Sequence, residues 1–451
     1  MTSKAPKIII KKKTGQAQKT LSEFNFDKAQ MPVVNDLRLK SYHQTAWANY
    51  ERLPFPSLKD EPWRRTDICK LNTDSFSLPI KKNNFQGPPK EVLNPAIMGV
   101  ERAGQIVSGA FETQSNLSPV LAQKGVIFSD FHTAEINHPE LMSKLLGRIV
   151  SSDEDKFTAL AAAMAKDGVF LYVPKNVVIE QPLHSLYWGA GENTAFINHI
   201  LVWVEEGAQV TFVHESSSPK ADSESQVFHD GIIEIYVGKN ARLNFVELQS
   251  WGKNVWSFTR ERARVMGDGK LEWIFGATGT HLTKNFSDID LVEPGAEGRI
   301  SGFYFTNGKQ HLDHDTQQNH LAGNTTSDLL YKGALMDESR SVWQGMIYVA
   351  PGADGTDGYQ ANRNLILSKG TRADSIPGLE ILADDVRCTH GATVGKIDED
   401  ELFYLYSRGI PEKEARQLIV MGFFEHIMNR IPFEGIQNRF KEAIIEKMAI
   451  G

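Results

Sequence analysis

The stretch IIEIYVGKNARLNFV, residues 232–246, decides the expected fold because it joins two short strand-forming runs through a turn. Both runs are rich in β-branched and aromatic residues, which favour extended backbone. Between the runs, Gly238 and Asn240 are residue types that let the chain reverse sharply. The stretch therefore predicts a strand, a turn and a second strand, and the same pattern recurs along the chain.

Turn-forming clusters follow one another at intervals of roughly thirty residues or a multiple of it, which is typical of a repeat architecture. They are Glu206-Gly207-Ala208, Gly238-Lys239-Asn240-Ala241, Gly267-Asp268-Gly269-Lys270, Gly295-Ala296-Glu297-Gly298 and Pro351-Gly352-Ala353-Asp354. Helix signals vanish between Val169 and about Val394. More than about two hundred residues of strand are too many for one ordinary sandwich, so we predict a right-handed parallel β-helix. A large sandwich or a cupin-like barrel is the alternative.

Helical patterns flank this β region on both sides. We expect residues 23–166 to form a mainly helical N-terminal domain and residues 396–451 to form a C-terminal helical domain. The β-helix core is expected over residues 167–395. Residues 1–22 are rich in lysine and are expected to form a disordered basic tail.

Charge, apolar runs and cysteine content limit the classes of function that the sequence supports. With 49 Lys and Arg against 56 Asp and Glu, the formal charge of -7 gives no indication of a nucleic-acid partner. The sequence contains no uninterrupted run of about 18 apolar residues, which is the length that a membrane-spanning helix needs. The two cysteines, Cys69 and Cys388, favour a reducing, cytoplasmic compartment, and we expect Cys69 to be a packing residue. An iron-sulfur cluster usually takes about four protein ligands, so any cluster role would need ligands from another chain.

The motif Cys388-Thr389-His390-Gly391 is the sharpest local feature. In an extended strand Cys388 and His390 point to the same face, so a thiol and an imidazole would lie side by side. Both groups can bind iron, and two ligands make an open site. A buried cysteine beside a hydrogen-bonded histidine is the alternative reading of the same motif.

A second group of polar residues contains His311, His314, Asp315 and His320. These residue types could bind a metal ion or exchange protons, as in a cupin-like metalloenzyme. In alternating strand geometry His314 and His320 share a face but His311 does not, so a structural role is the preferred reading.

Six motifs occur in a fixed order along the chain: EPWRRTD (61–67), DGVFLYVP (167–174), QANRNLILS (360–368), PGLEI (377–381), DDVRCTHGATVG (384–395) and LFYLYSRGI (402–410). In this combination the chain resembles the SufB/SufD scaffold family of iron-sulfur cluster assembly, over nearly everything after the basic tail. A SufB-like chain would be expected to carry further cysteines. The resemblance therefore favours the SufD branch.

The resemblance implies a non-enzymatic scaffold that works with one SufB-like chain and two copies of a SufC-like ABC ATPase. His390 matches a family histidine proposed to face a cysteine of the SufB-like partner, and Cys388 is its neighbour. Iron or a nascent cluster would be held only transiently, shared with that partner, and no cofactor would be bound stably by this chain alone. The C-terminal helices would dock the ATPase, through Arg408, Phe423 and Phe424 by their position. The chain could also form a homodimer when the SufB-like partner is absent.

One rival function belongs to a different class, the β-helix carbohydrate lyases and hydrolases. Such an enzyme would place acids in a groove lined by aromatic side chains, for which Trp251, Trp256 and Trp273 are the candidates. The sequence offers no convincing carboxylate pair for this chemistry.

Overall fold

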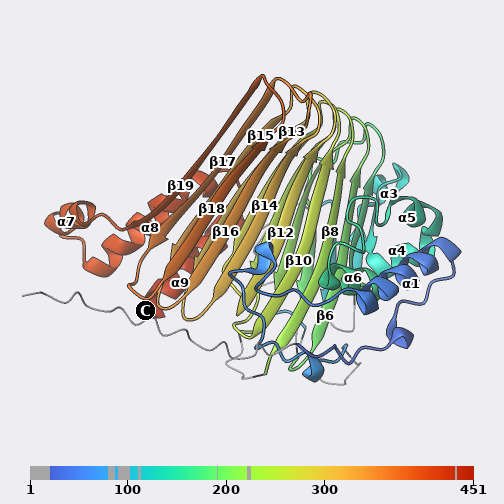
Figure 1. Ribbon diagram of the computed structural model, residues 1–451, viewed down its shortest axis with the longest axis horizontal. Coiled ribbons are helices and arrows are strands. Elements are labelled where there is room, and N and C mark those ends of the chain that lie inside the picture. Colours follow the sequence, from blue (N-terminus) through green and yellow to red (C-terminus); the bar gives the residue numbers. More distant parts are fainter. Residues whose placement is uncertain are drawn as a thin grey trace, which may run out of the picture.

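The computed structural model describes residues 21–79, 87–89, 102–109, 113–189, 191–220, 225–431 and 434–450. Its centre is a β-solenoid of about eight turns, with helices packed near both of its ends (Figure 1). The predicted parallel β-helix is confirmed, and the sandwich and the cupin-like barrel are excluded. Most of the predicted basic tail, residues 1–20, lies outside the described residues.

Successive strands of the solenoid alternate between two sheets that face each other. Among the described residues the larger sheet has, in spatial order, β2 (Thr113–Leu117), β1 (Gly104–Gly109), β5 (Leu183–Trp188), β7 (Gln209–Ser217), β9 (Arg242–Ser250), β11 (Lys270–Ala277), β13 (Glu297–Thr306), β15 (Thr326–Leu335), β17 (Thr356–Ile366) and β19 (Val386–Lys396). The smaller sheet has β3 (Ile127–Asp130), β4 (Asp167–Val173), β6 (Ala195–Val204), β8 (Val227–Val237), β10 (Val255–Val265), β12 (Leu282–Leu291), β14 (His311–His320), β16 (Arg340–Val349) and β18 (Arg372–Ile381). From β4 to β19 neighbouring strands of each sheet are parallel and in register.

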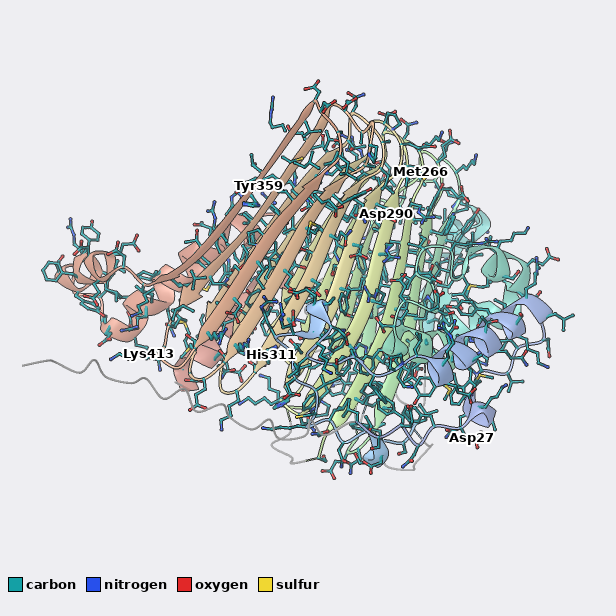
Figure 2. The ribbon with its side chains drawn as sticks, viewed as in Figure 1. Asp27, Met266, Asp290, His311, Tyr359 and Lys413 are labelled. Carbon is teal, nitrogen blue, oxygen red and sulfur yellow. The ribbon has the colours of Figure 1, made fainter. Side chains whose placement is uncertain are left out.

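The predicted turn clusters all lie at the corner where a strand of the smaller sheet passes to the larger sheet. Figure 2 shows Met266 in one of these turns, at the upper end of the strands, and His311 at the lower end, where β14 begins. Each turn hydrogen-bonds to the next along the solenoid: Gly207 N donates to Lys239 O at 2.8 Å, and Asn240 N donates to Gly267 O at 3.0 Å. Gly207 has φ of 69°, a left-handed conformation that glycine adopts without strain. The period seen in the sequence is thus one turn of the solenoid.

The lumen, meaning the space between the two sheets, holds the main hydrophobic core. Alternate residues of every strand point into it, as strand geometry requires. Large side chains such as Trp273, Trp343 and Tyr331 are fully buried there, and smaller aliphatic residues fill the spaces between them. Because each turn buries its apolar face only against its neighbours, the core extends along the whole solenoid.

The N-terminal helices cover the outer face of the smaller sheet. Here α6 (Lys156–Met164) packs on α1 (Leu37–Arg52) and on the sheet, and Phe157 stacks on Phe258 with ring centroids 4.3 Å apart. The remaining short helices are η1 (Lys28–Gln30), η2 (Glu61–Trp63), η3 (Thr73–Ser75), α3 (Pro119–Gln123), α4 (Phe131–Asn137) and α5 (Pro139–Leu145). In addition, β1, β2 and β3 of this mainly helical segment extend the two sheets, with β1 parallel to β5.

A buried cation attaches the N-terminal segment to the smaller sheet. Lys284 Nζ donates to the Pro62 carbonyl oxygen at 2.6 Å and to Asp315 Oδ2 at 2.8 Å, and it lies 3.1 Å from Asp313 Oδ2. The Lys284 and Asp313 side chains are fully buried, and Thr66 also hydrogen-bonds to Asp313. Burial raises the pKa of Asp315 to about 6, although the Lys284 ammonium opposes this shift. The ammonium therefore balances two carboxylates and holds the loop around Pro62 in place.

The C-terminal helices α7 (Glu399–Ser407), α8 (Glu412–Met428) and α9 (Glu434–Ile450) follow the last strand. α8 and α9 cover the outer face of the larger sheet, where Phe303 and Phe440 meet with ring centroids 4.0 Å apart. Arg439 of α9 also pairs with Glu215 of β7. In contrast, α7 projects away from the body beyond the last turn (Figure 1).

Replacing Lys284 by Met is expected to lower the free energy of unfolding by about 3–5 kcal/mol at about pH 8, because Asp313 and Asp315 lose their cation while they stay buried. The loss is expected to shrink at about pH 5, where the two acids take up protons. Denaturant unfolding at the two pH values measures both effects. Lys270→Met, which breaks the exposed pair with Glu297, is the control and should change stability by less than about 0.5 kcal/mol. Equal losses in both variants would contradict the assigned role of Lys284.

Replacing Phe424 by Ala is expected to cost about 3–5 kcal/mol, because its fully buried ring fills the space between α8 and the larger sheet. Phe403→Ala, at a ring that is 72% exposed on α7, should change stability by less than about 0.5 kcal/mol. Thermal or denaturant unfolding separates the two. A similar cost in both variants would mean that α7 is packed against the body.

Candidate functional site

The last turn of the solenoid carries the predicted pair Cys388 and His390 on β19. In the register of the larger sheet, Cys388 lies beside Gly358 and His390 lies beside Gln360 of β17. Neighbouring residues of parallel strands share a face of the sheet, so the direction of the β17 side chains decides the direction of the pair.

The β17 side chains in this register point into the lumen. Gln360 Nε2 donates to the Gly378 carbonyl oxygen of β18, across the lumen, at 2.8 Å. Asn364 Nδ2 donates to Ser375 Oγ of the same opposite strand at 3.2 Å. Gln360 is fully buried. Cys388 and His390 therefore face the lumen at its open end. The polar side chains of Gln360 and Asn364 lie in the lumen one turn below them.

Cys388 is half-buried and has a free thiol. It packs against the small apolar cluster formed by Ile347, Val349 and Ala353. A methyl group added to Gly358 would lie 3.2 Å from Cys388 Sγ, so the absence of a side chain at Gly358 makes room for the thiol. Burial raises the pKa of the Cys388 thiol above its ordinary value, which keeps it protonated until a metal ion or another electrophile displaces the proton.

His390 is exposed and makes no hydrogen bond or ion pair with any other described residue. This excludes the reading in which the histidine is a buried, hydrogen-bonded structural residue. A free imidazole and a nearby thiol at the rim of the lumen offer two donor atoms to a soft or borderline metal. Nowhere in the described part of the chain do three or more His, Cys, Asp or Glu side chains gather closely enough to hold a metal ion. The described residues therefore do not complete a metal site around this pair.

The rim around this pair consists of two strand edges. β19 ends the larger sheet and β18 ends the smaller one, with no further strand beside either among the described residues. Four exposed apolar side chains accompany these edges: Leu379, Ile381, Leu382 and Val394. Figure 2 shows Tyr359, which is also partly exposed, near the upper end of the neighbouring β17. Unpaired edges with apolar side chains are suited to pairing with a further strand.

The three residues assigned to ATPase docking lie in different environments. Arg408 is exposed, and its guanidinium lies 5.3 Å from the centre of the Tyr404 ring. Phe423 is half-buried, with the Lys332 ammonium 4.9 Å from its ring centre. Phe424 is fully buried against the chain's own sheet, so its side chain is not accessible to a partner in this conformation.

Sequence reasoning missed the exposed aromatic side chains of α7. Phe403 is 72% exposed, Tyr404 58% and Tyr406 38%. They follow four acids at the start of the helix: Asp398, Glu399, Asp400 and Glu401. The available signal was the run Phe403-Tyr404-Leu405-Tyr406 in a short helix, which is too aromatic for a helix that packs along only one face.

The structure does not bring the second group of polar residues into one site. His314 and His320 share a face, as the strand pattern predicted; this face is the lumen, where burial lowers their pKa to about 3 and about 4. His311 faces the outer side, where Nε2 lies 2.9 Å from Thr66 Oγ1. Asp315 is paired with Lys284. His311 and Asp315 thus contribute to the attachment of the N-terminal segment, whereas His314 and His320 lie in the core, so the described residues form no cupin-like metal site.

The rival enzyme also lacks its groove. Trp251, Trp256 and Trp273 are 3%, 3% and 1% exposed, so none of them lines an open surface. Cys69 is half-buried, and hydrogen bonding to Asp67 raises the pKa of its thiol. None of the helices in the described residues combines the length and the hydropathy needed to cross a membrane.

Comparison with known proteins adds two family matches that together span most of the chain. Residues 187–423 match the SufBD core domain of the SUF system of FeS cluster assembly, and residues 19–184 match the N-terminal region of SufBD proteins. An iron-sulfur cluster assembly SufBD family protein of Staphylococcus saprophyticus is 29% identical over 439 residues, covering 94% of this chain and 92% of the relative. A relative of the same description from Staphylococcus aureus strain USA300 has the same identity and coverage. The first match contains the last turn and its thiol and imidazole pair, and the chain belongs to the SufBD family of iron-sulfur cluster assembly proteins.

Proposed function

We propose that this chain is a non-catalytic, SufD-like scaffold subunit that pairs with a SufB-like subunit, and that a nascent cluster forms where the two meet. One observation carries the proposal: Cys388 and His390 stand at the open end of the lumen, framed by two unpaired strand edges. A chain with only two cysteines favours the SufD branch over the SufB branch.

The strand edges give the pairing its physical basis. Backbone N–H and C=O groups along the free sides of β18 and β19 have no partner strand among the described residues, and a second scaffold can supply one. Such an interface would remove the exposed side chains of Leu379 and Ile381 on β18 from water, which would stabilise the complex. The same edges could pair with a second copy of this chain when a SufB-like partner is absent.

The pair of donors explains why two chains are needed. Iron in a cluster usually takes about four protein ligands, mostly thiolates, and this site offers one thiol and one imidazole. The partner would complete the set with its own thiolate. The cluster is cargo, held transiently between the subunits, and this chain alone binds no cofactor stably. The two free cysteines are consistent with a reducing, cytoplasmic setting.

The exposed helix α7 supports the ATPase-docking part of the proposal. Its aromatic side chains and its acidic first turn form a surface that would suit an apolar groove with a basic rim on a SufC-like ABC ATPase. Arg408 closes this helix and lies beside Tyr404. Because α8 is packed on the larger sheet, a movement of the ATPase pair would be passed from α7 and α8 to the last turns of the solenoid.

Replacing His390 by Ala is expected to leave the assembly with the SufB-like and SufC-like partners intact and to lower the yield of reconstituted cluster at least about tenfold, because the imidazole is a ligand. Co-purification and the cluster's visible absorption measure the two effects. Thr389→Ala, on the opposite face of the same strand, is the matched control and should behave as the parent. If His390→Ala builds cluster at the parental level within an intact complex, the assignment of the site is wrong.

Replacing Phe403 and Tyr404 together by Ala is expected to weaken co-purification of the ATPase while the SufB-like subunit still binds. Both rings are exposed, so the folded state should survive the change. These substitutions are preferable to deleting the C-terminal helices, because deletion would uncover Phe303 and Phe305 on the larger sheet. Val120→Ala, at an exposed apolar residue on α3, is the control. Undiminished ATPase binding by the double variant would place the docking surface elsewhere.

A further inference from the structure

Two carboxyl groups meet inside the solenoid, far from the last turn. Glu247 of β9 points into the lumen from the larger sheet, and Glu261 of β10 points into it from the smaller sheet. Their side chains are in hydrogen-bonding contact. Both are buried, with Glu247 8% exposed and Glu261 fully enclosed. The contact therefore bridges the two sheets across the lumen.

The surroundings of the pair contain no cation. In the alternating pattern of the described parallel strands β4 to β18, no lumen-facing position holds Lys or Arg. Asn285 Nδ2 donates to Glu261 Oε1 at 2.5 Å, and Ser287 Oγ lies 2.9 Å from Glu261 Oε2. The titratable groups nearest to the pair are His214 of β7, which lies beside Glu247 in the sheet register, and Tyr331 of β15, which interacts with both carboxyl groups.

The two carboxyl groups differ in the hydrogen-bond donors that surround them. Glu261 Oε1 accepts from Asn285 Nδ2, and Glu261 Oε2 lies within hydrogen-bonding distance of Ser287 Oγ. Glu247 lies close to the Trp273 indole, which opposes the rise in its pKa, but its Oε2 atom is buried without a donor. Two carboxylates in contact in a medium of low dielectric constant cannot both be ionised without a large cost. If Glu247 carries a proton on Oε2 and donates it to Glu261, this oxygen gains a hydrogen-bond partner. The repulsion between two ionised carboxylates is then absent.

We propose that Glu247 and Glu261 share one proton across the lumen, and that loss of this proton turns a bond between the two sheets into a repulsion. The pair is a pH-sensitive device of the solenoid itself. This inference does not depend on the proposed function, and its test needs neither partner nor cluster.

The direction of the pH effect follows from burial. Burial raises the pKa of Glu247 well above its ordinary value and raises that of Glu261 to about 7. Because the folded chain binds these protons more tightly than the unfolded chain, the pair's contribution to stability is fully present at low pH and is lost as pH rises through about 7. Neighbouring His214 stays neutral in this range, since burial lowers its pKa to about 3.

Infrared spectroscopy in heavy water tests the shared proton directly. The parent chain should show the carbonyl stretch of a protonated carboxyl group at about neutral pH, where exposed carboxyl groups are ionised. Glu247→Gln should lose the part of this band that comes from the pair, because its amide can donate to Glu261 but has no proton to lose, while the buried Asp230, whose pKa is also raised by burial, keeps its own part. Glu297→Gln, on the outer face of the larger sheet, is the matched control and should keep the band.

Thermal unfolding between about pH 6 and about pH 9 gives the second readout. The melting temperature of the parent and of Glu297→Gln should fall as pH rises, whereas that of Glu247→Gln should fall less. A parent without the carboxyl band at neutral pH, or a band whose intensity is the same in Glu247→Gln as in the parent, would overturn the proposal. So would a rise in melting temperature on adding Mg²⁺ or Mn²⁺ that Glu247→Gln abolishes, because an ion rather than a proton would then occupy the site.

Discussion

Hydrogen bonding between one turn and the next is the interaction on which the rest of this structure depends. Each strand of the solenoid satisfies its backbone groups on the strands of the preceding and following turns, in parallel and in register. The arrangement fixes which side chains enter the lumen and which face outwards, because the direction alternates along every strand. A stack of turns must also end with strands that pair on one side only. Among the described residues these strands are β18 and β19, each of which keeps one free side.

The same alternation of side chains along the strands explains why helices cover the outer faces of the two sheets. The outer side of the smaller sheet carries Phe228, Phe258 and Phe286, and the outer side of the larger sheet carries Phe303 and Phe305. Such surfaces must be covered, and the helices before and after the solenoid do this. The covers are also fastened by charge: Lys284 holds the N-terminal segment, and Arg439 holds α9. Among the described residues, the last turn and α7 combine exposed apolar side chains with no covering helix, which is why both are proposed to contact partners.

The sequence was sufficient for the architecture because the turn spacing is visible without any knowledge of contacts. It also placed Cys388 and His390 on one face of a strand, and His311 on the opposite face from His314 and His320, since a period of two is enough for that. It could not tell which face was the lumen, because inward positions here include polar residues such as Gln360 and Asn362 as well as apolar ones. It could not foresee that Asp313 and Asp315 are neutralised by Lys284, because that contact joins separate turns. For the same reason helix periodicity alone did not show that Phe424 faces the sheet while Phe403 faces solvent.

Hydrogen exchange at the amides of β18 and β19 tests the central claim most directly, namely that the free edges of the last turn are the surface on which a second scaffold adds its strands. Exchange is compared between the isolated chain, at concentrations low enough to prevent self-pairing, and its complex with a SufB-like subunit. Amides of Arg372–Ile381 and Val386–Lys396 that point to the free edge should exchange rapidly in the isolated chain and become protected in the complex, while β11 and β13 stay unchanged. A stable complex in which these two strands keep their rapid exchange would contradict the account, because the partner would then bind elsewhere and leave Cys388 and His390 outside the interface.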